Sequence, residues 1–148
     1  MTATVTDAEA EAWTVLQSHL MAMGYLENVD IGEPKAPPSP TAAAIVPMSG
    51  RPDTTVLNAP RYVHQVSLRF YGEGIGENRE KVERELSQIR ANILGDIWGD
   101  FTLGGNVVQV IPRMTEWRWG WVAISGTMFR LLDITIGIRL DASYTFAE

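Results

Sequence analysis

Cysteine is absent from the 148-residue sequence, and histidine occurs only twice. Without cysteine the chain can form no disulfide bridge, no thiolate zinc site and no cysteine nucleophile. His19 and His64 lie far apart in the sequence, and neither has a carboxylate four residues further on to suggest a helical metal-binding motif. We therefore expect neither a metal site nor a bound cofactor.

Basic residues are scarce, with 12 Lys and Arg against 18 Asp and Glu and a formal charge of −6. A nucleic-acid-binding surface needs a basic stripe that displaces counterions, and anionic lipid also attracts basic residues. No stretch approaches the roughly 20 consecutive apolar residues that span a bilayer, and the acidic N-terminus lacks the basic region of a signal peptide. We therefore expect a protein of the soluble phase with no membrane partner.

Motifs of the common enzyme classes are also missing. Gly74 and Gly76 do not form a dinucleotide-binding motif, because Arg79 occupies the place of its third glycine, and acidic residues in the same turn would repel an anion. No serine stands in a nucleophile-elbow motif, and the spacing of the aspartates brings no pair of carboxylates together. We therefore expect no catalytic residues.

Two segments, residues 6–24 and 77–98, have the apolar spacing of amphipathic helices. In the first, Thr6 and Glu9 have the spacing of a capping box, and Gly24 is placed to close the helix. The second carries pairs of opposite charge four residues apart, which support an exposed face. The buried stripes are predicted to be Trp13, Leu16, Leu20 and Met23 in the first helix, and Val82, Leu86, Ile89, Ile93 and Ile97 in the second.

Seven of the eight prolines lie in residues 33–60. Because proline withholds a backbone donor and fixes φ, this segment is predicted to form neither a helix nor a central strand. At most residues 41–46 are expected to make a short edge strand. Two interpretations remain, a surface loop or an extended arm, and we favour the arm because its Ala-Ile-Val patch would gain by burial.

Alternation of apolar and polar residues predicts strands at 61–71, 106–112, 117–124 and 128–140, after a weaker one within 25–32. In the last, Leu132, Ile134, Ile136, Ile138 and Leu140 are predicted to face the core, and the tail DASYTFAE follows the strand. The order of elements predicts an α+β fold, with two helices packed on one face of a mainly antiparallel sheet and a long Pro-rich arm. Residues 1–148 are predicted to form one domain that includes this arm at 33–60.

Trp117, Trp119 and Trp121 occupy alternate positions of one predicted strand and so share one face of the sheet. They could pack beneath the helices or lie at an interface between subunits, where tryptophan is enriched. Stacking on single-stranded nucleic acid is disfavoured by the charge of −6.

Four segments together resemble a known family. They are SPTAAAIVPMSG after a Pro-rich lead, YVHQVSLRFYGE, DFTLGGNVVQVIP and FRLLDITIGIRLDASYTF. The chain from about residue 39 onward resembles the tail terminator proteins of long-tailed (siphovirus-type) bacteriophages, in particular those of phages that infect actinobacteria. None of the segments is catalytic, and the WRWGW segment is not typical of the family.

This resemblance implies a structural protein of the virion, assembled in the host cytoplasm. Members of the family form a homohexameric ring on the tail tube protein, stop its polymerisation and join the tube to head-completion or neck proteins. DNA passes through the lumen of the ring, and an acidic subunit suits passage without specific binding. Residues that we expect at subunit or partner contacts are Ile45, Val46, Arg51, Arg69, Trp117, Trp119, Trp121, Arg139, Tyr144 and Phe146.

Two other functions stay open at this point. Another head–tail connector, such as a head-closure or neck protein, would share the size, acidity and assembly behaviour of a terminator. A small α+β enzyme or ligand-binding module would instead use the free face of the sheet as a pocket.

Overall fold

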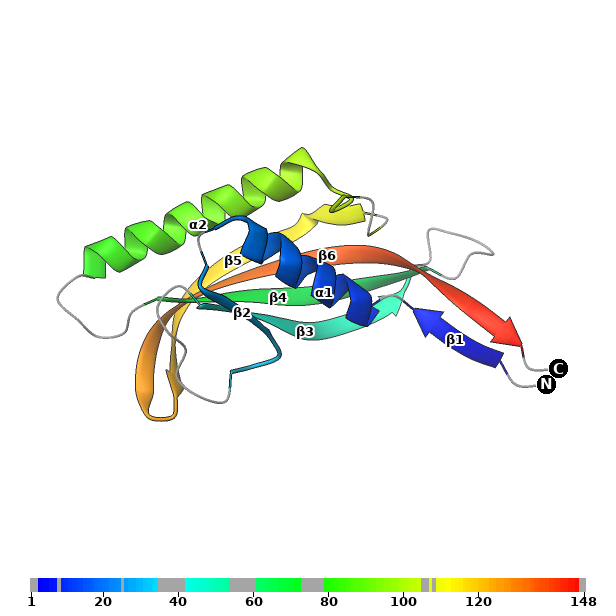
Figure 1. Cartoon of the computed structure of the whole chain (residues 1–148), viewed down its shortest axis with the longest axis horizontal. Helices are drawn as coiled ribbons and strands as arrows, with labels where there is room; N and C mark the ends of the chain where they lie inside the picture. The colour runs from blue at the N-terminus through cyan, green and yellow to red at the C-terminus, as the bar shows by residue number, and fades with distance from the viewer. Residues whose placement is uncertain are drawn as a thin grey trace.

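The computed structural model describes residues 3–7, 9–24, 26–34, 42–53, 61–72, 79–104, 107 and 109–146. Within them the chain has the predicted α+β fold, with helices covering a mostly antiparallel sheet (Figure 1). In chain order the elements are β1 (Ala3–Asp7), α1 (Glu9–Ala22), β2 (Asn28–Ile31), β3 (Ala42–Pro52), β4 (Arg61–Gly72), α2 (Arg79–Gly99), β5 (Gln109–Ile124) and β6 (Thr127–Phe146).

The long strand β6 organises the sheet, because it pairs with β4, with β5 and, at its end, with β1. From β6 the order continues through β4 and β3 to β2, and only β2 and β3 run parallel. Among the described strands, β5 and β2 are therefore the two outer strands of the main sheet. β5 and β6 form a hairpin through Ser125 and Gly126, whose positive φ values of 50° and 81° match the tight turn that a twisted hairpin favours.

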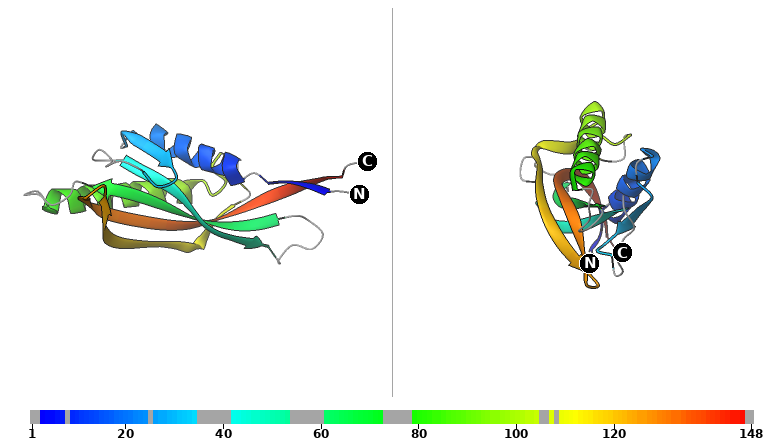
Figure 2. Two further views of the ribbon diagram at one scale, coloured as in Figure 1. Left: turned by 90° about the horizontal axis from the view of Figure 1, so that it is seen from below. Right: turned by 90° about the vertical axis from the view of Figure 1, so that its left-hand side faces the viewer.

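The core lies between the helices and one face of the sheet (Figure 2). The predicted stripe of α2 is buried, and so are the five apolar residues of β6 that were expected to face the core. In α1, Leu16 and Leu20 are buried, while Trp13 and Met23 are partly buried against the same core. Gly24 follows α1 with φ of +76°, as a helix-closing glycine should.

The first helix begins later than predicted. Thr6 does not cap it but lies in β1, where its backbone pairs with Ser143, and α1 starts at Glu9. The expected tail is likewise not separate, because β6 continues to Phe146 and pairs with β1. Strand pairing between β1 and the end of β6 therefore takes the place of the helix cap that the local sequence predicts. The two paired strands extend beyond the helices (Figure 1).

The Pro-rich segment contains a longer and more central strand than predicted. β3 spans 11 residues between β2 and β4 rather than forming an edge. Its pairing with β2 ends at Ile45, and its register with β4 shifts between Pro47 and Ser49. Pro47 therefore sits at an irregularity beyond the doubly paired part, where a missing donor is tolerated. The remainder of the predicted arm, residues 35–41 and 54–60, lies outside the described residues.

The two strands predicted at 106–112 and 117–124 are one strand, β5, with an irregular register between Ile111 and Glu116. Pro112 falls in this bulge, which explains why the sequence suggested a break. Met114 fills the space over Gly137, where an added Cβ would lie 2.6 Å from the Met114 sulfur.

No helix in the described part of the chain is long and apolar enough to cross a membrane.

Candidate interaction surfaces

The three tryptophans lie on the same face of the sheet as the helices, but they are not buried beneath them. In register, Trp117 pairs with Ile134 and Trp119 with Leu132, both of which are core residues. The indoles nevertheless remain 42%, 38% and 44% exposed. The reason is their place on the outer strand β5, at the border of the area that α2 covers.

Two arginines lie over these rings. The guanidinium carbon of Arg90, on α2, is 4.6 Å from the centre of the Trp117 ring. That of Arg130, on β6, is 5.2 Å from Trp119 and 5.1 Å from Trp121. All three distances are within the range of cation–π attraction. We call these five residues the Trp–Arg ladder.

Arg130 is held firmly in this position. Its Nε donates to Glu83 Oε1 on α2 at 2.7 Å, and its Nη1 donates to the carbonyl of Gly120 at 3.0 Å. An arginine whose charge is paired and whose guanidinium group lies near two indole rings has little conformational freedom left to lose. The ladder is therefore a preorganised, half-apolar strip with a charged rim, which is the composition typical of protein–protein contacts.

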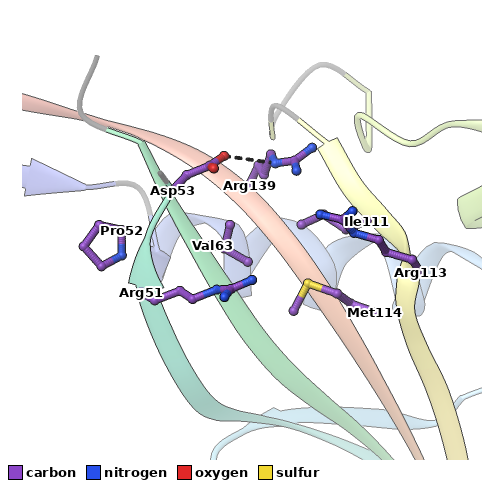
Figure 3. A pocket seen from close by; sticks show the side chains of 8 residues that line it. All are labelled: Arg51, Pro52, Asp53, Val63, Ile111, Arg113, Met114 and Arg139. Atoms are coloured by element: carbon purple, nitrogen blue, oxygen red, sulfur yellow. Dashed lines mark hydrogen bonds and ion pairs between the residues drawn. The ribbon is translucent and has the colours of Figure 1, made fainter. Parts of the chain in front are cut away.

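A second surface, on the opposite face, gathers arginines. Arg51 of β3, Arg113 of β5 and Arg139 of β6 line a depression of about 60 Å³ together with Asp53 (Figure 3). Its floor is formed by Val63, Ile111 and Met114, and Pro52 completes the lining. We call it the arginine pocket. Arg51 and Arg139 are both among the residues expected at subunit or partner contacts, and the sheet brings these two together.

Of the three arginines in the arginine pocket, only Arg139 has an acidic partner among the described residues. The Asp53 side chain is only 4% exposed, and its Oδ2 accepts from Arg139 Nε at 3.1 Å. Arg139 also donates from Nη1 to Gln109 Oε1 at 2.6 Å. Arg51 and Arg113 are exposed and have no hydrogen-bond or ion-pair partner among the described residues.

Arg69, another predicted contact residue, belongs to a separate polar row on this face. Its Nη1 donates to Glu33 Oε1 at 2.9 Å, and its Nε lies 3.8 Å from Asp133 Oδ2. Asp133 in turn accepts from the hydroxyl of Ser67. The charge of Arg69 is thus compensated by Glu33 and Asp133, and Arg69 does not line the arginine pocket.

Of the other predicted contact residues, Ile45 is fully buried in the core of the chain itself, so its side chain is withheld from partners. Val46 packs with Ala44, Tyr71 and Phe129 in a small cluster on the helix-free face. Burial raises the pKa of the Tyr71 phenol.

Two further residues expected at contacts, Tyr144 and Phe146, lie at the end of β6. Their backbones pair with those of Val5 and Ala3 in β1.

Each of the two histidines contacts an acidic side chain of another element. His19 of α1 contacts Asp96 of α2, which ties the two helices together, and His64 Nδ1 lies 3.4 Å from Glu9 Oε1. Among the described residues there is no group of three histidine or acidic side chains that could hold a metal ion.

Four residues that complete these surfaces were missed in the sequence: Arg90, Arg130, Arg113 and Asp53. Arg90 and Arg130 follow the apolar spacing of α2 and β6, but only the packing of α2 beside β5 places them over indoles. Arg113 lies in a bulge, where alternation does not predict the direction of a side chain.

Comparison with models of known protein families gives no match, and no curated protein is similar in sequence.

Proposed function

We propose that this protein is a structural subunit of a phage tail, which assembles into a ring of six on the head-proximal end of the tail tube and stops the tube from growing. The observation that carries the proposal is the Trp–Arg ladder on β5, an outer strand with no second partner among the described strands. The resemblance of four segments to tail terminators is the reason for proposing a ring of six on the tail tube as the assembly.

The ladder has the properties of a contact that is completed by another chain. Three indoles on alternate positions of one strand are each partly exposed, and neighbouring exposed apolar side chains mark interaction sites in folded proteins. Tryptophan and arginine are also the residues that most often dominate the binding energy of an interface. Pairing along the unpaired side of β5 would add backbone hydrogen bonds to this contact.

A closed ring requires two different surfaces on each subunit, because its contacts run head to tail. The strand order puts the ladder on the β5 side of the sheet and the second outer strand, β2, on the other. Ile31 of β2 is 42% exposed, and Met21 of α1, the helix that contacts β2, is 43% exposed. We infer that the ladder of one subunit meets the β2 side of the next.

The negative charge agrees with a channel for DNA. Six copies at −6 each would repel phosphates rather than hold them, which lowers friction during passage. Tube protein on one side of the ring and a head-completion or neck protein on the other would be its partners.

The test is to determine the copy number and position of the chain in assembled particles by electron microscopy, and then to replace Trp119 with Ser. We expect six copies at the head-proximal end of the tube, and we expect Trp119→Ser to reduce ring formation at least tenfold. Trp98→Ser is the matched control, because Trp98 is 55% exposed but lies outside the ladder.

Three or twelve copies, or equal effects of the two substitutions, would contradict the proposal. Six copies at the neck rather than on the tube would instead identify a head-closure or neck protein. A stable dimer with a bound small molecule would favour a ligand-binding module.

A further inference from the structure

The arginine pocket is unusual in a chain of net charge −6, because three arginines and only one carboxylate line it. Arg139 already donates hydrogen bonds to Asp53 and to Gln109. The pocket therefore keeps a local charge of about two positive units on Arg51 and Arg113, neither of which has a hydrogen-bond or ion-pair partner in the described part of the chain.

The backbone brings these groups together through irregularities in two strands. Arg51 follows the register shift of β3, and Arg113 lies within the bulge of β5. Bulges redirect side chains at the surface of a sheet, and here they direct arginines from separate strands to one depression (Figure 3). Arg113 is anchored locally, since the next residue, Met114, packs over Gly137.

The chemistry of the lining selects a small oxyanion. The planar guanidinium group matches the paired oxygens of phosphate, and a hydrogen bond between two charged groups is stronger than one between neutral groups. A volume of about 60 Å³ is far below the roughly 300–1,000 Å³ of sites for organic ligands.

We propose that Arg51, Arg113 and Arg139 bind a single phosphate group, with Asp53 holding Arg139 in place. The group can be free phosphate or a phosphodiester of a nucleic-acid backbone, because both present the same oxygens. The site lies on the face of the sheet opposite the Trp–Arg ladder, and phosphate binding to a single chain tests it without any measurement of ring formation.

The experiment is a titration of the full chain followed by NMR of the arginine side chains at low ionic strength. One arm uses inorganic phosphate, the second uses diethyl phosphate as the phosphodiester probe, and sodium chloride at matched ionic strength provides the reference. We expect saturable shifts of Arg51 and Arg113 with at least one of the two phosphates. The arm that binds more tightly identifies the source.

Arg51→Gln and Arg113→Gln should each weaken this binding by about tenfold, because each removes charged hydrogen bonds to the phosphate. Both side chains are exposed, so the variants are expected to fold. Arg118→Gln is the matched control: it removes the same charge from the same strand, but its side chain is 80% exposed and lies near Glu116. It should bind phosphate as the unmodified chain does.

Two results would overturn the proposal. One is the absence of saturable binding in both arms. The other is an equal loss in Arg113→Gln and Arg118→Gln, which would mean that the shifts report the overall charge of the protein and no defined site.

Discussion

Single residues show how strongly position within the fold sets the role of a side chain. Ile45 and Ile31 are both isoleucines of adjacent strands, yet one is fully buried and the other is 42% exposed. Arg139 and Arg113 line the same pocket, but only Arg139 has its charge compensated by a buried carboxylate. The consequence of a substitution therefore follows from burial and partners more than from residue type.

Ile136 is completely buried in the middle of β6. We expect Ile136→Asp to abolish folding, because an unpaired buried charge costs several kcal/mol, comparable to the total stability of about 5–15 kcal/mol for a domain. Circular dichroism and a denaturant titration provide the measurement. Ile31→Asp makes the same chemical change at an exposed site and should fold. A soluble, cooperatively unfolding Ile136→Asp protein would show that the buried face of β6 is wrongly assigned.

Asp100 accepts hydrogen bonds in the turn after α2, and these bonds make the free energy of unfolding depend on pH. Hydrogen bonds from the Thr102 hydroxyl and from the backbone N–H groups of Gly104 and Thr102 lower the pKa of this carboxyl group. Its contribution is therefore present above the pKa of the unfolded chain and is lost as the pH falls through the lowered folded value.

We expect Asp100→Ala to lower the free energy of unfolding at pH 7 and to have a smaller effect near pH 2, measured by denaturant titration at both values. Asp100→Asn keeps one acceptor oxygen and should recover part of the loss at pH 7. An equal loss at both pH values would show that the charge of Asp100 plays no part.

At the scale of elements, close contact between α2 and the sheet depends on one small residue. An added Cβ at Gly72 of β4 would lie 2.6 Å from Val82 Cγ1 and 3.0 Å from Leu86 Cδ1. Both belong to the buried stripe of α2, which also positions Glu83 and Arg90 against the Trp–Arg ladder. The geometry of the ladder therefore depends on the approach of α2 to β4.

Gly72→Ala is expected to destabilise the protein by about 1–3 kcal/mol, because Val82 is too stiff to yield without moving the helix. Gly95→Ala is the control within α2: its added Cβ meets nothing within 4 Å, so the better helix former should stabilise the protein by about 0.5–1 kcal/mol. Thermal unfolding of both variants is the measurement. A neutral Gly72→Ala would mean that α2 can shift freely over the sheet.

At the scale of the whole molecule, the distribution of charge matters more than its sum. The chain is acidic, yet arginines gather at the Trp–Arg ladder and at the arginine pocket. Arg69 and Arg139 are already paired with carboxylates, so few basic groups remain for an extended polyanion.

We expect no measurable affinity for double-stranded DNA at physiological salt, with or without assembly, because the net charge of −6 on each subunit repels phosphates and salt screens the few phosphate contacts that one pocket per subunit can make. A fluorescence anisotropy assay across salt concentrations tests this. Salt-dependent binding that is lost in Arg69→Glu or Arg139→Glu would contradict the expectation and would point to a basic lumen.

The sequence by itself determined the α+β class, the buried stripes of α2 and β6, and the unsuitability of the chain for thiolate chemistry, because local periodicity and residue type decide these features. Only the tertiary structure decided that Thr6 pairs with Ser143, that β3 is a central strand despite its prolines, and that Arg90 and Arg130 cover the tryptophans. These features depend on pairing between segments far apart in the chain, and such pairing leaves no local pattern in the sequence.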